Sequence, residues 1–242
     1  MCGIYITNIP FNKMEVLNKL EKIKYRGPDN LGYEKINRVT LGHLRLAIID
    51  LDVRSNQPFA YGKYRIVFNG EIYNFETLKT ELKKIDYEFN TESDTEVLIK
   101  GYEAWGSDLL SKLNGMFAFS IYDVEKNTIF SARDRLGVKP FYYYWKNGEI
   151  EICSQLAPLI NESSKICNDA VSAYLDCGYV PSPLSILKDV YKLEPGNFMI
   201  IDLASNSLEI NSYWDLDKVE VNNISYAQAK EELHELLKDA VK

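Results

Sequence analysis

The sequence predicts an α+β protein in which antiparallel strands and amphipathic helices lie in separate layers. Two helical patterns follow each other at about residues 75–85 and 94–105, and a run of β-rich segments with turn signals comes after them. Strands and helices that are segregated along a chain favour layered sheets over alternating βαβ units. We expect this layered domain to span residues 1–160.

The first third of the chain predicts a strand, a helix and two further β-rich segments. Residues 3–7 are a short apolar run, and apolar residues then recur at helical spacing up to the RGPD stop signal. The recurring positions are Val16, Leu17, Leu20 and Ile23. The segments VTLGHLRLAIID and YRIVFNGEIYNF are β-rich and are separated by polar turn residues.

Each of the two paired helices shows one apolar face. The first presents Phe75, Leu78, Leu82 and Ile85, and the second presents Val97, Leu98, Tyr102 and Trp105. Ser93 and Glu96 have the spacing of a capping box, which predicts that the second helix begins at Asp94. The strands expected after it are GMFAFSIYD, TIFSARDR, PFYYYWKNG and EIEICSQ.

Residues 161–224 are predicted to be a joining region that contains a short helix at about 169–176. A last helix over 225–242 begins at a capping box formed by Ser225 and Gln228. Its apolar positions are Ala229, Leu233, Leu236, Leu237, Ala240 and Val241. An amphipathic helix has to bury such a face, either on this domain or on another one. Because the pattern continues to the last residue, we favour the second alternative and expect this helix to open a second domain of which the rest is absent.

Composition and charge argue against several classes of function. The chain has 242 residues, is 46% hydrophobic, and has a formal net charge of -7 and a pI of about 5.1. Nonspecific nucleic-acid binding depends on clustered Lys and Arg, so we expect none. No stretch reaches the ~20 apolar residues needed to cross a bilayer, and no signal-peptide pattern is present. We therefore expect a soluble, cytoplasmic protein that does not bind membranes.

The four cysteines are Cys2, Cys153, Cys167 and Cys177. They form no CxxC pair, and the two histidines do not complete a zinc-ligand pattern, so no metal site is predicted. We expect reduced thiols, three of them as packing residues. Cys2 differs because it directly follows the initiator methionine and precedes a short apolar strand.

A cysteine thiol is a good nucleophile only when a base removes its proton. If Met1 is removed, the α-amino group of Cys2, with a pKa near ~8, can take that proton directly or through a water. The small side chains of Cys2 and Gly3 suit removal of the methionine. While Met1 is attached, the Cys2 nitrogen is an amide and cannot act as a base.

Six motifs occur along the chain in the order MCGI, YRGPDNLG, GHLRLAIID, NGEIYN, ESDTE and RDRLGVKPFYY. Together they resemble the glutaminase domain of class II glutamine amidotransferases, the N-terminal-nucleophile kind. RGPD and NGEIYN are similar to motifs of the glutamine-hydrolysing asparagine synthetases, and YWDL and KEELHELLKDAVK resemble that family's bridge into its ATP-using domain. The resemblance covers essentially the whole chain. It implies a four-layer αββα sandwich of two antiparallel sheets, the Ntn-hydrolase type.

The resemblance assigns the catalytic step to a small set of residues. Cys2 would form a thioester with the substrate, while the Asn69 side chain and the Gly70 backbone N–H would stabilise the oxyanion, at ~3 kcal/mol per donor. From residue types alone Asn-Gly also fits a tight turn, and that alternative stays open. Arg26 would help to close the pocket. His43 is an alternative base, although a structural hydrogen bond suits it better.

Substrate-binding residues are implied at both ends of a glutamine molecule. Arg45 is the natural bidentate partner for the α-carboxylate, although a lone arginine is often only a surface residue. Asp94, helped by Glu71, can pair with the α-ammonium, and an acidic residue there also suits the start of a helix. Main-chain groups of the segment after Arg45 are expected to complete the site: Leu46, Ala47, Ile48 and Ile49.

The resemblance implies that this chain hydrolyses L-glutamine to glutamate and ammonia without a metal or cofactor. In a full-length enzyme the ammonia would serve ATP-dependent asparagine synthesis from aspartate, with ATP and Mg²⁺ used by the synthetase domain. This chain contains no Ser-Gly-Gly-x-Asp-Ser loop, GxxxxGK[ST] or GxGxxG. The expected partners are L-glutamine and the synthetase domain, and a homodimer is a further expectation. Two alternatives stay open: another ammonia acceptor, and a non-catalytic regulatory module that binds glutamine.

Two positions depart from the family's common pattern. Tyr25 precedes Arg26 where relatives often have a histidine, and Gln155 follows Ser154 where they often have a glutamate. Both departures leave the contacts between domains open and do not overturn the glutaminase interpretation.

Overall fold

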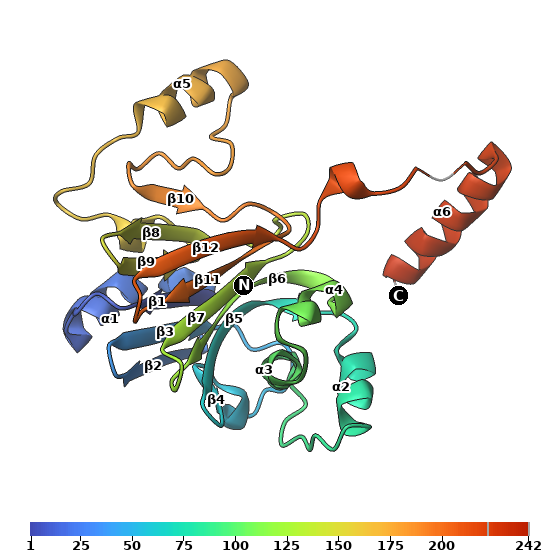
Figure 1. The fold of residues 1–242 in the computed structure, drawn as a ribbon, viewed down its shortest axis with the longest axis horizontal. Helices are drawn as coiled ribbons and strands as arrows, with labels where there is room; N and C mark the ends of the chain where they lie inside the picture. Colours follow the sequence, from blue (N-terminus) through green and yellow to red (C-terminus); the bar gives the residue numbers. More distant parts are fainter. Residues whose placement is uncertain (222, 242) are drawn as a thin grey trace.

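The computed structural model describes residues 1–221 and 223–241. Asn222, in the predicted joining region, and Lys242, in the predicted last helix, lie outside the described residues. The described chain folds as two antiparallel sheets stacked face to face, with helices on their outer surfaces (Figure 1).

The first sheet has six strands, and the strand at the amino terminus lies in its middle. Their order is β10 (Val190–Lys192), β8 (Tyr142–Lys146), β9 (Glu149–Cys153), β1 (Gly3–Thr7), β3 (Val39–Arg45) and β2 (Asn30–Ile36). Gly3 of β1 lies opposite Leu44 of β3, so Cys2 is brought next to the end of β3.

The second sheet also has six strands. Their order is β12 (Ser207–Ser212), β11 (Asn197–Asp202), β7 (Thr128–Arg133), β6 (Gly115–Asp123), β5 (Tyr64–Ile72) and β4 (Phe59–Tyr61). β5 is nine residues long and pairs with β6 along its whole length. The edge strands β2 and β4 were not predicted separately from the sequence, because each is short or only partly buried and lacks a clear apolar alternation.

Three hydrophobic clusters hold four layers together. Ile4 and Ile6 of the first sheet meet Val67 of the second in the core between the sheets. α1 (Lys13–Glu21) covers the outer face of the first sheet. The helices α2 (Phe75–Lys83), α3 (Asp94–Trp105) and α4 (Leu109–Lys112) cover the outer face of the second. The predicted αββα sandwich is confirmed by this arrangement.

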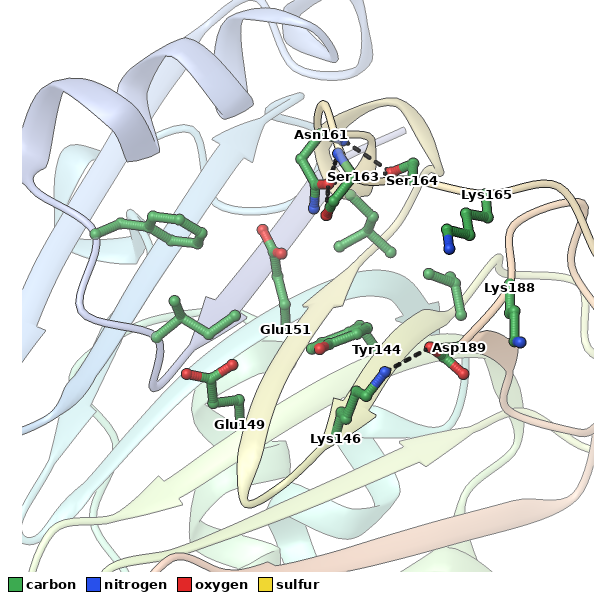
Figure 2. Close-up of a pocket in the computed structure, with 14 residues that line it drawn as sticks. Tyr144, Lys146, Glu149, Glu151, Asn161, Ser163, Ser164, Lys165, Lys188 and Asp189 are labelled. Carbon is green, nitrogen blue, oxygen red and sulfur yellow. Dashed lines mark hydrogen bonds and ion pairs between the residues drawn. The ribbon is translucent and has the colours of Figure 1, made fainter.

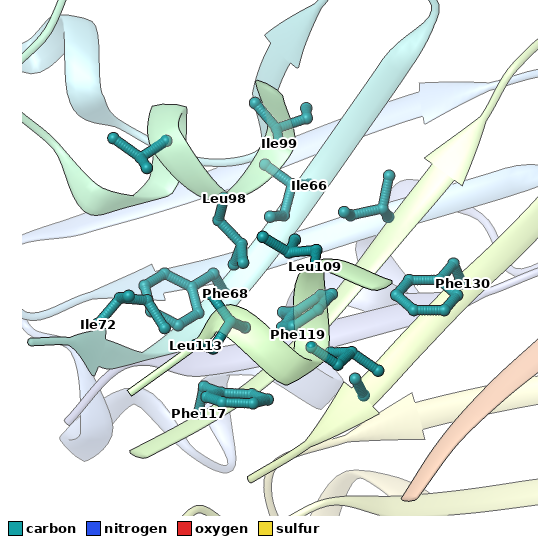
Figure 3. Close-up of a cluster of buried hydrophobic side chains, with 14 of the residues drawn as sticks. Ile66, Phe68, Ile72, Leu98, Ile99, Leu109, Leu113, Phe117, Phe119 and Phe130 are labelled. Carbon is teal, nitrogen blue, oxygen red and sulfur yellow. The ribbon is translucent and has the colours of Figure 1, made fainter. Parts of the chain in front are cut away.

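Aromatic and aliphatic side chains join α3 and α4 to the second sheet. Figure 3 shows Ile66 and Phe68 of β5 packed with Leu98 of α3 and Leu109 of α4. Burying one such side chain contributes about 1.5–3 kcal/mol, so this cluster is a main source of stability for the layer.

α3 begins at Asp94 and ends at Trp105 as predicted, but its capping differs from the prediction. Ser93 Oγ accepts a hydrogen bond from the Thr95 amide at 3.1 Å. The expected capping box does not form, because the Glu96 carboxylate turns away to the Thr91 amide at 2.7 Å and the Lys100 ammonium at 2.7 Å. Two other nearby partners therefore take the place of the Ser93 amide.

The predicted joining region contributes strands to both sheets. β10 pairs with β8 in the first sheet, and β11 pairs with β7 in the second, so strand pairing continues well beyond residue 160. The short helix expected at about 169–176 is α5 (Asn168–Cys177).

The last described helix, α6 (Tyr226–Val241), begins at the predicted capping box, with Gln228 N donating to Ser225 Oγ at 3.3 Å. It stands away from the sandwich (Figure 1). Its apolar side chains are exposed, Leu236 by 68%, so this face does not pack on the rest of the described chain. No helix within residues 1–221 and 223–241 is both long and apolar enough to span a bilayer.

Candidate functional site

Strand alternation directs several predicted site residues toward the space between the sheets. Successive side chains of a strand point to opposite faces, so Cys2 continues the inward-facing row of Ile4 and Ile6. By the same rule Asn69 and Glu71 continue the row of Val67 in β5. The thiol and the asparagine amide thus come from opposite sheets and face the same interlayer space.

The Cys2 thiol lies against the backbone of Leu46. The Leu46 amide donates to Cys2 Sγ at 3.4 Å, and Sγ lies 3.6 Å from the Leu46 carbonyl oxygen. Burial raises the pKa of the Cys2 thiol, and the Leu46 amide offsets part of that rise. Burial also lowers the pKa of the nearby Met1 amine. The thiol is therefore protonated at neutral pH and needs a base before it can act as a nucleophile.

Asn69 and Gly70 lie inside strand β5, which rules out the tight-turn alternative for this dipeptide. Asn69 is 1% exposed, and its Nδ2 has no hydrogen-bond partner within the described part of the chain. Gly70 crosses β6 so closely that a Cβ would lie 2.3 Å from the Met116 carbonyl oxygen. A buried amide donor without a partner is costly, so this donor is available for a ligand.

Arg45 is buried at the end of β3, which excludes the alternative of a surface arginine. Its Nη1 donates to the Asp52 carbonyl at 3.0 Å and to Asn56 Oδ1 at 2.8 Å, while its Nη2 donates to the Ile49 and Asp50 carbonyls. The guanidinium thereby shapes the loop of residues 46–56 that forms one wall of the cavity.

Two carboxylates lie on the other side of the cavity. Asp94 Oδ2 accepts a hydrogen bond from the Ile72 amide at 3.1 Å, and Asp94 is 5% exposed. Burial raises the pKa of Asp94 to about 7, with Glu71 adding to the rise and the Ile72 amide opposing it. Burial also raises the pKa of Glu71, which Lys139 opposes. The positive charge of a ligand ammonium group placed here would stabilise the ionised form of both carboxylates.

Arg26 and His43 make structural contacts beside the site. Arg26 Nε donates to the Cys2 carbonyl oxygen at 2.9 Å, which places this side chain next to Cys2 but outside the cavity wall. His43 Nε2 lies 3.1 Å from the Phe68 carbonyl oxygen and joins the two sheets. Burial lowers the pKa of His43 to about 4, so its ring is neutral and a poor general base at pH 7.

A small cavity of about 40 Å³ collects most of these groups. Its wall contains the predicted Cys2, Arg45, Leu46, Ile48, Ile49, Gly70, Glu71 and Asp94. Ala47 is not part of the wall, because its amide turns away to Asp29 Oδ2 at 2.8 Å. A volume of 40 Å³ holds about three waters, so a whole glutamine requires the wall to move.

Several lining residues were missed from the sequence: Ser55, Gln57, Phe68, Ser93 and Thr95. Gln57 has the most extensive role, since its Oε1 accepts from the Phe68 amide at 2.6 Å and its Nε2 donates to Thr95 Oγ1 at 3.2 Å. Sequence periodicity contains no signal for such a contact. The SNQPF segment reads only as a loop.

A larger cavity, of about 670 Å³, lies elsewhere (Figure 2). Its wall includes none of the predicted site residues. Two of its acidic groups are paired: Asp189 Oδ2 lies 3.0 Å from Lys146 Nζ, and Glu151 Oε1 lies 2.8 Å from Nζ of Lys19, which is outside the wall. Size alone therefore does not locate the chemistry of this protein, and the smaller cavity beside Cys2 is the candidate site.

The structure is thus a two-sheet αββα sandwich with a thiol beside its first strand and an amide donor on the facing sheet. The chain belongs to the glutamine amidotransferase domain family, whose model matches residues 1–214. It is 41% identical over 273 residues to the putative glutamine-hydrolysing asparagine synthetase 2 of Methanocaldococcus jannaschii, covering 100% of this chain and 52% of the relative. It is 31% identical over 265 residues to amidase chry2 of Gibberella zeae, covering 100% of this chain and 39% of that protein. The chain thus spans about half or less of the length of these relatives.

A solved structure supports the fold assignment. The glutamine phosphoribosylpyrophosphate amidotransferase from B. subtilis superposes with a TM-score of 0.66 at 18% identity. The match covers 88% of this chain and 49% of that one. At this level of identity the likeness concerns the fold, and it agrees with the predicted Ntn-hydrolase type.

Proposed function

We propose that this chain hydrolyses L-glutamine to L-glutamate and ammonia through a thioester on Cys2. The observation that carries the proposal is the convergence of three chemically distinct groups at one cavity. The Cys2 thiol, the Gly70 backbone and a pair of carboxylates with raised pKa values line it. Asn69, which precedes Gly70 in β5 and lies just outside the wall, adds a buried amide donor that has no partner among the described residues. These are the groups that amide hydrolysis of an amino acid requires.

The proposed reaction begins once Met1 has been removed. The freed α-amino group of Cys2 takes the thiol proton, and the sulfur attacks the side-chain amide carbon of glutamine. When the tetrahedral intermediate collapses, the C–N bond breaks and the same ammonium group returns the proton to the leaving amine, which departs as ammonia. Water then attacks the thioester, the C–S bond breaks, and glutamate and the free thiol are formed.

The oxyanion of the tetrahedral intermediate would be stabilised by the Asn69 amide and the Gly70 backbone N–H. Asn69 supports this role because its Nδ2 is buried and unused by the described residues. A donor held in place before the reaction contributes more than one that must reorient, about 2.7–4 kcal/mol per donor.

The two ends of glutamine would be recognised by opposite walls of the cavity. The α-ammonium would pair with Asp94 and Glu71, whose ionised forms it stabilises. The α-carboxylate would bind Arg45. Since all four Nη hydrogens of Arg45 are now directed to loop 46–56, bidentate binding requires some of these loop contacts to exchange for the substrate.

The fate of the ammonia is a further part of the proposal. Similarity to an asparagine synthetase favours aspartate as the acceptor in a longer protein, with ATP and Mg²⁺ used by a separate synthetase domain. Similarity to an amidase favours a second candidate, in which the same glutaminase chemistry supplies a different acceptor. In both cases the glutaminase residues of this chain have the same roles, and a cytoplasmic location suits the free thiols.

The test is glutamate release from L-glutamine by this chain, without ATP or aspartate, together with the intact mass of the protein. We expect turnover only in molecules that have lost Met1. A chain that lacks Met1, binds glutamine and yet releases no glutamate would instead support a regulatory glutamine-binding module.

Glutamine binding is expected to weaken as the pH falls through 7. Burial raises the pKa of Asp94 to about 7, so below that pH the free protein holds a neutral acid that cannot pair with an ammonium group. Affinity should therefore level off above about pH 7 and fall by up to about tenfold per pH unit below it. Calorimetric titration of a Cys2→Ala variant with L-glutamine at several pH values measures this without turnover.

The matched control for this pH effect is Asp94→Asn in the same Cys2→Ala background. Its amide does not titrate, so its weaker binding should be independent of pH near neutrality. An unchanged pH profile in this variant would show that another group controls the binding of the ammonium.

A further inference from the structure

One buried carboxylate outside the predicted site joins the two walls of the cavity. Asp50 has a side chain that is 6% exposed, and its Oδ2 accepts from Ser55 Oγ at 2.8 Å and from the Glu92 amide at 2.9 Å. Its Oδ1 accepts from the Asp52 amide at 3.3 Å. Burial would raise the pKa of Asp50, but these hydrogen bonds outweigh it and lower the pKa, so the group is ionised at neutral pH.

The two segments that Asp50 connects are far apart in the sequence. Loop 46–56 follows Arg45 and forms the wall that would receive the substrate carboxylate. The segment 90–93 precedes α3 and delivers Asp94 to the opposite wall. These segments are not neighbouring strands of one sheet, so no backbone ladder holds them in register.

Each segment is also anchored separately on its own side. Arg45 donates to the carbonyls of loop 46–56, and Glu96 accepts from the Asn90 and Thr91 amides. The Asp50 carboxylate connects the two segments, because it accepts a hydrogen bond directly from the backbone of segment 90–93. Gln57 adds a neutral contact to Thr95 at 3.2 Å. A charge-assisted hydrogen bond is about twice as strong as a neutral one, so Asp50 is the stronger of these two cross-links.

We propose that Asp50 is a positioning residue that ties loop 46–56 to the start of α3 and thereby sets the distance between the carboxylate-binding and ammonium-binding ends of the glutamine site. The inference rests on the proposed glutaminase function. Asp50 does not line the cavity. It acts through Glu92 and Ser55.

The backbone at Asp50 permits a clean test. Its φ is +47°, in the left-handed region where Asp and Asn are favoured over most other residues. Asp50→Asn therefore keeps the shape and the backbone preference, but it removes the charge and leaves one acceptor oxygen for the three present donors. The control is Arg54→Gln, which removes only the exposed partner 3.6 Å from Asp50 Oδ2 and leaves the hydrogen bonds to Ser55 and Glu92 in place.

The experiment compares wild type, Asp50→Asn and Arg54→Gln by glutaminase kinetics and by hydrogen exchange. For Asp50→Asn we expect the KM for glutamine to rise about tenfold or more, with kcat changed less than about threefold. Backbone amides of both 46–56 and 90–94 should exchange faster in this variant. Arg54→Gln should match wild type in both measurements. A merely local structural role would accelerate exchange in loop 46–56 alone.

The proposal is overturned if Asp50→Asn keeps the wild-type KM, or if exchange in 90–94 is unchanged. It is also overturned if Arg54→Gln reproduces the full effect, because then the surface charge pair and not the cross-link would be responsible. If the wild-type chain without Met1 neither binds nor hydrolyses glutamine, the proposed function fails. In that event the exchange data alone decide whether Asp50 couples the two segments.

Discussion

Cys2→Ala is expected to abolish glutamate release while leaving the fold intact. The thiol is the proposed nucleophile, and the cavity wall contains no other cysteine among the described residues. Cys2 belongs to none of the three hydrophobic clusters, so loss of its sulfur should change the melting temperature little. The measurement is coupled detection of glutamate under saturating glutamine, with circular dichroism to verify folding.

The matched control is Cys177→Ala, which removes an exposed thiol at the end of α5, outside the cavity. This variant should keep wild-type turnover. Substantial activity in Cys2→Ala would place the nucleophile elsewhere and would refute the thioester mechanism. Equal loss of activity in both variants would indicate a general effect of the substitutions and not the loss of a nucleophile.

Asn69→Ala is expected to lower kcat by about 10²–10³ with a much smaller change in KM. The Asn69 amide would interact with the oxyanion, a charge that exists only in the transition state and intermediate. Stability should fall only slightly, because Nδ2 makes no hydrogen bond among the described residues and truncation removes a buried unpaired donor. Steady-state kinetics and thermal denaturation of the same preparation separate the two effects.

Asn8→Ala provides the opposite control. Asn8 is equally a buried asparagine, but its Nδ2 donates to the Gly148 carbonyl at 2.7 Å and its Oδ1 accepts from the Ile150 amide at 2.8 Å. Its truncation should lower the melting temperature and leave kcat nearly unchanged. If Asn69→Ala instead raised KM and preserved kcat, Asn69 would be a ground-state binding group and the oxyanion role would be wrong.

Local patterns in the sequence predicted most of the elements that bury a continuous apolar face. α3 was predicted to its terminal residues, and the apolar runs of β1, β6 and β9 were recognised as strands. Errors occurred at the ends of the helices, where several local hydrogen-bonding patterns compete. α2 ends at Lys83, and Ile85, predicted to face inward, is 50% exposed. Glu96 is directed to Thr91 and Lys100 and does not complete the capping box with Ser93.

The sequence motifs predicted part of the candidate site. They did so only where they identified residues whose types suit the same reaction. Cys2, Arg45 and Asp94 lie around one cavity, as the resemblance implies, although their catalytic and binding roles stay predictions. Gln57 and Asp50 could not be predicted, because each acts through a hydrogen bond to a segment remote in sequence. No periodicity or spacing within a loop specifies which distant amide it will meet.

The sequence by itself determined the layered class of the fold, the alternation that turns Cys2 and Asn69 inward on their strands, and the set of groups available for amide hydrolysis. Those properties follow from nearest-neighbour geometry, since strand side chains alternate with a period of two. Only the tertiary structure decided that the two inward rows face each other across one space, and that loop 46–56 meets the start of α3 through Asp50. Such contacts depend on how whole layers pack, and the free energy of packing is a property of many residues at once.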